Sequence, residues 1–324
     1  MGGRLAGWAT GRPSGARERD PGATNSFRAA RWLGLVLTLG LGSNAGALLG
    51  QEVVHAGRGV SRDAVIRIVL LTGSLRVNAW SRDSVWVEGR VDAGIGRFFL
   101  AGAASALKLG VEPAQDYQPG GTADLDVRVP AGARLRVTSA ATDIDITAGG
   151  GSVEVTTGSG RVRIAGSVEA VSAETLDGNV ELALNGGTGR VRTASGTIVV
   201  RGVIRDLEAS TVSGPVEVGM ERPIARARME TVSGEIAFKG SLDRDGRLEA
   251  QTHGGDVELR LPARLAAAFH LVSYGGGLVN KLVAPATLHR GPGKGEWSFT
   301  TGDGQATVEI RTFKGTITLK PKGE

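Results

Sequence analysis

Inward-facing and polar positions alternate along most of the chain between residues 130 and 260, and short copies of one pattern recur. The segments TVSGPVEV (211–218) and TVSGEIAF (231–238) are the clearest pair. Relative to the glycine of each segment, apolar residues or threonine stand three, five and seven positions before it, and apolar residues two and four positions after it. A period of two residues is typical of a β-strand with one buried face. The pattern therefore predicts two short strands per unit, one on each side of the glycine.

The same unit recurs at eight places. Each copy has threonine three residues before the glycine and an apolar residue five residues before it. Successive glycines are 18, 18, 18, 20 and 21 residues apart before the spacing becomes irregular, which indicates a repeat architecture. The repeat positions are Thr157, Thr175, Thr193, Thr211, Thr231, Thr252, Thr301 and Thr312, with Gly160, Gly178, Gly196, Gly214, Gly234, Gly255, Gly304 and Gly315.

The chain must bend near each of these glycines. Five residues, an odd number, separate the last inward position before the glycine from the first one after it. In one unbroken strand, an odd step would place the apolar residues of the second half on the outer face. Glycine suits a corner because it adopts positive φ without steric cost, and the preceding Ser or Asp can hydrogen-bond to the local backbone. We therefore expect positive φ at Gly214 and its equivalents.

A β-solenoid accounts for the near-constant repeat length. Stacked coils would place like side chains in rows, with threonine hydroxyls bonded along one row and small Ala, Thr and Val side chains filling a narrow interior. The sequence thus predicts an all-β fold, a β-solenoid similar to a β-helix with an N-terminal β-strand region. An antiparallel β-sandwich of the same short strands is the alternative.

The segments that flank the repeats divide the chain. RFFLAGAASALKLGVE (97–112) is predicted as a hairpin, with a short amphipathic helix as the alternative, and RLAAAFHLV (264–272) as a helix or a bulged strand. We expect a signal peptide at 1–47, an N-terminal β-strand region at 48–130 with an insertion at 94–121, a β-strand repeat domain at 131–320 and a tail at 321–324.

Residues 1–47 have the parts of a secretory signal. Arg28 and Arg31 precede the apolar segment WLGLVLTLGLGSNAGALLG, and small residues at Ala45 and Ala47 suit cleavage after Ala47. If its Gly- and Ser-rich end counts as membrane-compatible, the segment reaches spanning length and could stay as an N-terminal anchor. The leader is long, which leaves a downstream start codon open. We expect an exported protein of the periplasm, cell envelope or cell surface.

Most of the excess positive charge lies in that leader. The chain has 38 Lys and Arg against 33 Asp and Glu, of which residues 1–47 hold six arginines and two acidic residues. The remaining 32 basic and 31 acidic side chains alternate along the predicted strands. Because no phosphate-neutralising patch is visible, nucleic-acid binding is not expected.

The repeated units resemble a known bacterial family. The resemblance rests on the TxSGxVxL units, on the strand region that joins them through LDVRVPAGARLRV, and on the closing segment FTTGDGQATVEIRTFKGTITLK. Over residues 60–320 these features are similar to the β-strand-repeat proteins that are grouped as a domain of unknown function and named "putative adhesin". The resemblance implies an exported or surface β-solenoid, and it supplies no catalytic residue.

No catalytic, cofactor-binding or metal site is expected. The chain has no cysteine and no G-x-S-x-G motif, and none of its four histidines stands in a metal-ligand pair with another. The pairs Asp124/Asp126 and Asp143/Asp145 each face one side of a strand; they form a small cation site if they stack, or otherwise only the polar face of their strands. Exposed aromatic residues are typical of sugar-binding faces, and the best candidates gather upstream of the repeats. These are Trp80, Trp86, Phe98 and Phe99.

We therefore expect a non-enzymatic protein of the cell envelope, an adhesin-like structural or binding module without a cofactor. Its charged faces would contact an envelope or surface partner, either a protein or a polysaccharide, and it would contact a membrane only through an uncleaved leader. A β-helical enzyme that acts on polysaccharides is one alternative. An end-to-end self-assembling scaffold is another, because an uncapped solenoid end is an open strand edge, which the tail KPKGE (320–324) would protect.

Overall fold

The computed structural model describes residues 50–115, 120–282, 288–291, 293 and 295–323. By its contacts the chain divides into a unit of residues 1–46 and a unit of residues 47–324, and the described residues belong to the second. The predicted leader lies outside the described residues. The described part of the chain contains 25 strands and no helix, and thus no helix able to span a membrane.

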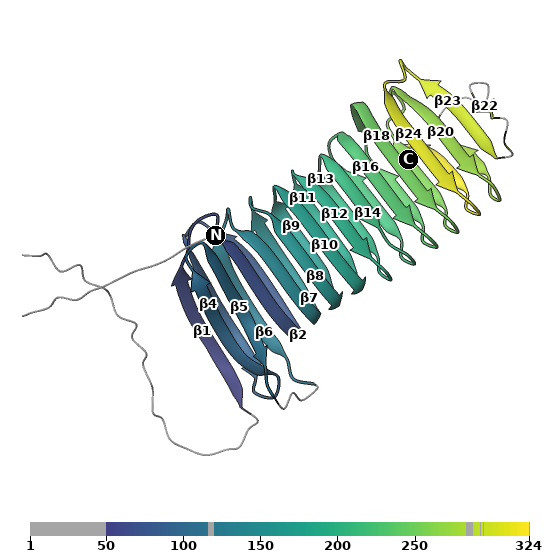
Figure 1. Cartoon of the computed structure of the whole chain (residues 1–324). Coiled ribbons are helices and arrows are strands. Elements are labelled where there is room, and N and C mark those ends of the chain that lie inside the picture. Colours follow the sequence, from purple (N-terminus) through teal and green to yellow (C-terminus); the bar gives the residue numbers. More distant parts are fainter. Residues whose placement is uncertain (1–49, 116–119, 283–287, 292, 294, 324) are drawn as a thin grey trace, which may run out of the picture. The chain divides into compact units, whose positions relative to one another are not determined.

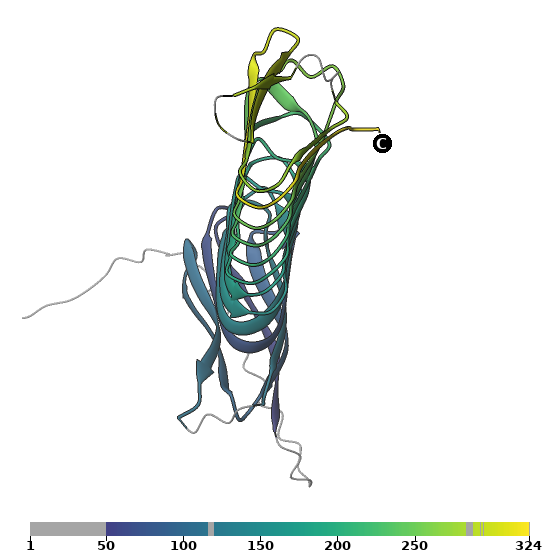
Figure 2. The same ribbon diagram turned by 90° about the vertical axis from the view of Figure 1, so that its right-hand side faces the viewer.

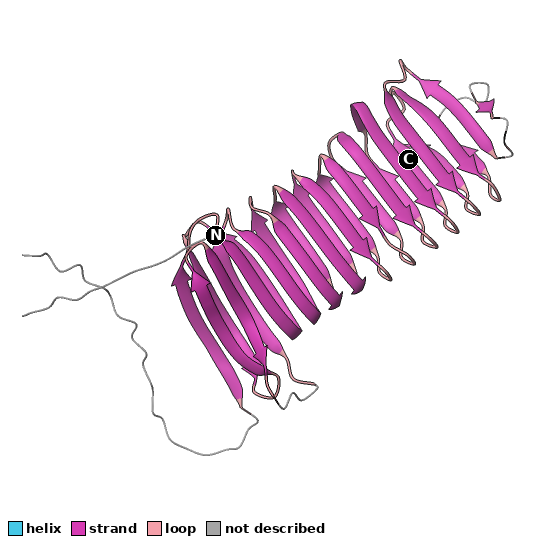
Figure 3. Ribbon diagram, in the orientation of Figure 1, coloured by secondary structure: helices cyan, strands magenta, loops and turns pink. Residues whose placement is uncertain are grey.

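Each central repeat forms one coil, with a strand on either side of the corner glycine (Figures 1 and 3). The strands before the glycines are β8 (Val153–Ser159), β10 (Ala170–Asp177), β12 (Thr188–Thr193), β14 (Asp206–Ser210), β16 (Ile224–Thr231) and β18 (Leu242–Thr252). The strands after the glycines are β9 (Val162–Ser167), β11 (Val180–Asn185), β13 (Ile198–Val203), β15 (Val216–Met220), β17 (Ile236–Lys239) and β19 (Val257–Leu261).

Neighbouring coils stack in parallel and in register. Thr175 pairs with Thr157, and Val180 pairs with Val162. Strands before the glycines form one parallel face, here the first sheet, and strands after the glycines form the second sheet. Figure 2 shows the coils superposed with the two faces opposite each other. The β-solenoid prediction is confirmed, and the antiparallel sandwich is wrong because successive coils are joined by parallel ladders.

The core lies between the two sheets. Side chains alternate along every strand, so that Val191 and Val200 are fully buried while Arg192 and Arg201 are exposed. Burial of each Val, Leu or Ile side chain contributes about 1.5–3 kcal/mol to the free energy of folding. The hydrogen bonds between strands add to this, and the chain has no cysteine to form a disulfide. Long rows of aliphatic side chains therefore hold the coils together.

The N-terminal end of the stack is built differently. Two strands, β2 (Val65–Trp80) and β7 (Arg134–Gly149), run through the corner without a break and pair along both halves. β5 (Ala106–Pro113) and β6 (Ala123–Pro130) pair in parallel with the two halves of β2. Antiparallel strands then follow on both faces. They are β4 (Gly96–Ala103) on β5, which confirms the predicted hairpin, β3 (Ser84–Asp92) on β6, and β1 (Gln51–Gly59) on β3.

Coil order departs from chain order at the C-terminal end (Figure 1). β24 (Ala306–Thr312) and β25 (Ile317–Pro321) lie between the coil of β18 and β19 and the coil of β20 (Ala267–Ser273) and β21 (Leu278–Asn280). β23 (Glu296–Thr301) pairs antiparallel with β20, and β22 (His289–Arg290) with β23. The tail after β25 therefore does not cover the end of the stack, contrary to expectation, because another coil lies beyond it.

The corner glycines are needed for a reason other than the expected one. Of the eight, only Gly160 and Gly304 have φ in the left-handed region, at 103° and 68°. A Cβ atom added at Gly214 would lie 1.8 Å from the carbonyl oxygen of Gly196 in the preceding coil. Positive φ at Gly214 was thus a wrong expectation. Glycine is required there because the backbones of successive coils approach too closely for a side chain.

Threonine side chains link successive corners. The Thr231 hydroxyl accepts a hydrogen bond from the Gly234 N–H of its own coil (3.0 Å) and donates one to the Gly214 carbonyl of the preceding coil (3.2 Å). From Thr193 onward the hydroxyls bond along the stack through glycine carbonyls, whereas Thr157 bonds to the Ser139 hydroxyl and Thr175 has no hydrogen-bond partner among the described residues. Seven predicted threonines occupy this buried row: Thr157, Thr175, Thr193, Thr211, Thr231, Thr252 and Thr312.

Thr301 and Gly304 do not belong to the row, and this part of the prediction is wrong. Thr301 ends the antiparallel strand β23, where its hydroxyl bonds to the Ala267 carbonyl (3.2 Å). Ser273 takes the equivalent place instead, in register with Thr312. The segment FTTGDG has the spacing of a repeat unit, but its strand pairs as a hairpin partner of β20 and does not form a coil.

Candidate binding surface

The outward-facing side chains of the two sheets form rows in which opposite charges meet between coils. Arg136 Nε lies 3.0 Å from Glu154 Oε2 on the first sheet, and Arg163 Nη2 lies 2.8 Å from Glu181 Oε2 on the second. Both pairs are largely exposed, and such pairs contribute about 0.2–1 kcal/mol each. The charged faces therefore add little to stability.

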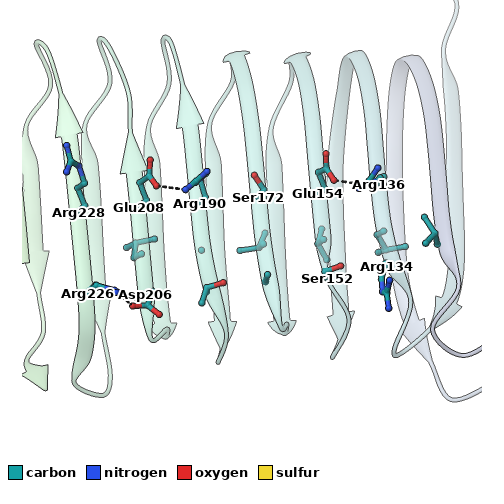
Figure 4. A pocket seen from close by; sticks show the side chains of 18 of the residues that line it. Arg134, Arg136, Ser152, Glu154, Ser172, Arg190, Asp206, Glu208, Arg226 and Arg228 are labelled. Carbon is teal, nitrogen blue, oxygen red and sulfur yellow. Dashed lines mark hydrogen bonds and ion pairs between the residues drawn. The ribbon is translucent and has the colours of Figure 1, made fainter. Parts of the chain in front are cut away.

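A furrow of about 800 Å³ crosses the outer face of the first sheet from β2 to β16 (Figure 4). Its charged groups stand on both sides of a central stretch of short side chains, and positive groups outnumber negative ones by three. We call it the arginine furrow. Its charged residues are Arg67, Arg134, Arg136, Arg190, Arg226 and Arg228, with Glu154, Asp206 and Glu208.

The centre of the arginine furrow is lined mainly by short side chains. Four short side chains line it there: Ser152 just before β8, Ala170 and Ser172 on β10, and Thr188 on β12. Figure 4 labels Ser152 and Ser172. Because these residues alternate with inward-facing ones, the floor is formed largely by strand backbone. A ligand lying along the furrow would meet this floor and the longer charged side chains at either side.

The acidic residues of the furrow are held by arginines. Arg226 Nε donates to Asp206 Oδ1 (2.7 Å), and this bond lowers the pKa of the Asp206 carboxyl. Glu208 lies 2.9 Å from both Arg190 and Arg192, and the bond from Arg192 is the main cause of its lowered pKa. These carboxylates are therefore ionised at neutral pH and neutralise part of the arginine charge.

Two arginines of the furrow carry charge that no described residue neutralises. Arg67 and Arg134 are exposed, and neither makes an ion pair within the described part of the chain. They lie on β2 and β7, next to Arg136. The N-terminal half of the furrow is thus its most positive part.

The two predicted aspartate pairs lie on the outer face of the second sheet but do not stack on each other. β2 lies between their strands, so that Ser74 separates Asp124 from Asp143, and Arg76 separates Asp126 from Asp145. No group of three or more acidic or histidine side chains is arranged for a metal ion among the described residues. The interpretation as polar strand faces is therefore the better one.

Exposed apolar side chains line the corners of successive coils. Each follows the threonine of its corner, or Ser273 in the case of Tyr274. The imidazole of His253 takes the same place in its coil, and its ring stacks on that of Phe313 with centroids 4.9 Å apart. The sequence did not reveal this line, because the coil of Phe313 precedes that of Tyr274 in the stack but follows it along the chain. The variable residue after each threonine was the available signal. Its members include Leu176, Val212, Val232, His253, Phe313 and Tyr274.

The features above define a parallel β-solenoid with charged outer faces and a buried threonine row. The chain belongs to the Toastrack DUF4097 family, which matches residues 133–320. This match confirms the family resemblance inferred from the TxSGxVxL units. No curated protein matches the chain.

Several solved structures are similar to the chain at low identity. A putative lipid binding protein from Parabacteroides distasonis has 10% identity and a TM-score of 0.48, with 83% of this chain and 97% of that chain covered. A putative adhesin from the same organism has 14% identity, a TM-score of 0.39 and the same coverage. A putative adhesin from Parabacteroides merdae has 10% identity and a TM-score of 0.32, covering 83% and 96%.

Proposed function

We propose that the protein is an exported, adhesin-like binding module that holds an acidic polysaccharide in the arginine furrow. The observation that carries the proposal is the excess of guanidinium groups along one face, including Arg67 and Arg134, which have no acidic partner among the described residues. Guanidinium groups bind carboxylate and sulfate groups through paired hydrogen bonds. A polyanion would therefore gain contacts that the protein does not make by itself.

The repeat spacing suits a linear ligand. The furrow crosses β2, β7, β8, β10, β12, β14 and β16, and adjacent strands are about 4.8 Å apart, so it spans roughly 29 Å. A polymer of that length contacts arginines from several coils at once. Each contact is weak in water, but simultaneous contacts raise the overall affinity. The furrow therefore favours a polymer over a single small anion.

Affinity for a polyuronate such as alginate tests the proposal. The double variant Arg67→Gln/Arg134→Gln removes two charges without breaking an ion pair, and we expect about three- to tenfold weaker binding at low salt. Lys239→Gln/Arg222→Gln removes two exposed charges outside the furrow and is the matched control. Equal effects of the two double variants, or equal binding of neutral dextran, would contradict the proposal.

The same polymer distinguishes binding from catalysis. Alginate and polygalacturonate are incubated with the protein, with and without calcium, and reducing ends are measured. We expect no increase over the polymer alone. New reducing ends would instead support the β-helical enzyme.

Export rests on the leader and has its own test. N-terminal sequencing of the native protein should begin at Leu48 if cleavage follows Ala47. A native protein that retains residues 1–47 would instead support the anchor.

A further inference from the structure

A second hollow lies on the outer face of the second sheet, near the N-terminal end of the stack. It measures about 520 Å³ and is bordered by β1, β3, β6 and the end of β2. Trp86 of β3 pairs with Gly57 of β1 on one side and with Arg128 of β6 on the other. Two tryptophans and three arginines thus converge on one patch, together with a single acidic residue, Glu88.

The Trp86 indole lies over the backbone of β1. A Cβ atom added at Gly57 would come 2.4 Å from Cε3 and 2.7 Å from Cζ3 of this ring. Any larger residue at this position would therefore clash with the ring in its present position. The ring is also fixed at its edge, because Nε1 donates to Glu88 Oε1 (2.8 Å). Since 37% of Trp86 is exposed, the ring presents a held aromatic surface to solvent.

Positive charge surrounds this surface. The Arg82 guanidinium lies over the Trp80 ring, 5.1 Å from its centroid, and Trp80 Nε1 donates to the Ser84 carbonyl (2.8 Å). Arg58 and Arg128 also border the hollow, and Arg128 is 3.9 Å from Glu88. The patch therefore combines a fixed aromatic ring with donors for one negatively charged group.

We propose that this patch binds one acidic sugar unit, a hexuronate. The apolar C–H face of the sugar ring packs on the Trp86 indole, and its carboxylate pairs with Arg58, Arg82 or Arg128. The site lies on the opposite sheet from the arginine furrow. Binding at this site can therefore be tested independently of the function proposed for the furrow. We call it the tryptophan site.

The surroundings favour a sugar over a single-stranded nucleic acid, which also stacks on aromatic rings beside basic residues. The hollow next to it on the same sheet face is lined by five carboxylates and three guanidinium groups, and so has a net negative charge. These are Glu88, Asp124, Asp126, Asp143 and Asp145, with Arg76, Arg161 and Arg163. A strand with a phosphate at every nucleotide that continued into this hollow would meet its net negative charge, which disfavours binding. The hexuronate unit held on Trp86 places its own carboxylate beside the arginines of the tryptophan site, outside that hollow.

Calorimetric titration of the full chain with trigalacturonate, galactotriose and oligo-dT tests the proposal. We expect trigalacturonate to bind, galactotriose to bind at least about tenfold more weakly, and Trp86→Ala to lose about tenfold or more in affinity. The furrow variant Arg67→Gln/Arg134→Gln should bind the trisaccharide as the unchanged protein does. That variant separates this proposal from the function proposed for the furrow.

Two further variants test the proposal if Trp86→Ala does not fold. Trp86→Phe keeps a smaller ring and should retain part of the affinity, while Arg82→Gln/Arg128→Gln keeps both indoles and should lose the preference for the acidic trisaccharide. Unchanged thermal melting is the check on folding. The proposal is overturned by equal affinity of Trp86→Phe, Arg82→Gln/Arg128→Gln and the unchanged protein, by tighter binding of oligo-dT, or by no binding of trigalacturonate.

Discussion

In the coils of Thr211, Thr231, Thr252 and Thr312, the corner depends on two residues with separate physical roles. The threonine hydroxyl satisfies a glycine N–H of its own coil and a glycine carbonyl of the preceding one, both in a buried place. The glycine lets these two backbones approach. Because a buried backbone group without a partner is costly, the threonine acts as a polar link inside an apolar core.

Replacement of Thr231 by valine tests this link. The change keeps the shape but leaves the Gly234 N–H and the Gly214 carbonyl without their hydroxyl partner, and we expect a loss of about 1–3 kcal/mol in the free energy of unfolding. Thr175 is the matched control, because its buried hydroxyl has no hydrogen-bond partner. Thr175→Val should therefore be neutral or stabilising in urea denaturation. A similar loss in both variants would show that the hydroxyl is not the cause.

Replacement of Gly214 by alanine tests the close approach. The added methyl group would meet the Gly196 carbonyl at 1.8 Å, so the corner must open, at a cost of about 1–3 kcal/mol. Gly219 lies in the same coil, and the nearest atom to its added Cβ is 3.9 Å away, on Arg201. Gly219→Ala should leave the denaturation midpoint nearly unchanged. Equal midpoints for the two variants would refute the steric argument.

At the scale of elements, each coil depends on its neighbours. A coil contacts only the coils on either side, so stability is distributed as a sum of local terms. Among the described residues, the end coil of β20 and β21 has a coil neighbour on one side only, the inserted coil of β24 and β25. β23 pairs with its first strand on the other side. The strands that end the stack there, β21 and β22, are three and two residues long, and short edges discourage further pairing.

Loss of the Phe269 ring should act locally on this end. Phe269 of β20 is buried and stacks on Phe299 of β23 with centroids 4.3 Å apart. Phe269→Ala should cost about 3–5 kcal/mol, with faster hydrogen exchange confined to β20–β25. Phe238→Ala, in the middle of the stack, should instead expose β15, β17 and β19. Uniform loss of protection in both variants would contradict a stack of local units.

At the scale of the whole molecule, charge outside residues 1–47 is nearly balanced, with 32 basic and 31 acidic side chains, but it is unevenly placed. Opposite charges alternate across the coils, and the arginine furrow keeps a local excess of arginine. Bonds from Arg226, Arg192 and Lys320 lower the pKa values of Asp206, Glu208 and Glu258, respectively. The folded protein therefore binds protons at these carboxyls less readily than the unfolded chain.

Acid should destabilise the protein through these groups. Their contribution is complete above the ordinary pKa values of 3.8 for Asp and 4.5 for Glu and is lost as pH falls through the lower folded values. Each partly exposed pair contributes about 0.2–1 kcal/mol. Urea midpoints should be level with respect to these groups from pH 6 to 8 and fall below about pH 4. A smaller acid loss is expected for Glu208→Gln/Glu258→Gln, and an unchanged loss would assign the effect to other carboxyls.

The candidate sites followed from the sequence only in part. The upstream tryptophans were candidates for a ligand site because sugar-binding faces offer exposed aromatic residues, but the place of Gly57 under Trp86 depends on the pairing of β1 with β3. The arginine furrow was not predicted, because Arg67 meets Arg136 only once β2 pairs with β7.

The amino-acid sequence alone determined the strands, the inward faces and the corners of the central coils, because a two-residue period and a fixed Thr-x-x-Gly spacing are local properties. Only the tertiary structure decided the order of the end coils. FTTGDG carries the same local signal as a true corner, yet its strand pairs antiparallel with β20, while Ser273 takes the place of Thr301 in the buried row. The choice between these partners depends on which coil is adjacent in space, and that information does not reside in any single segment.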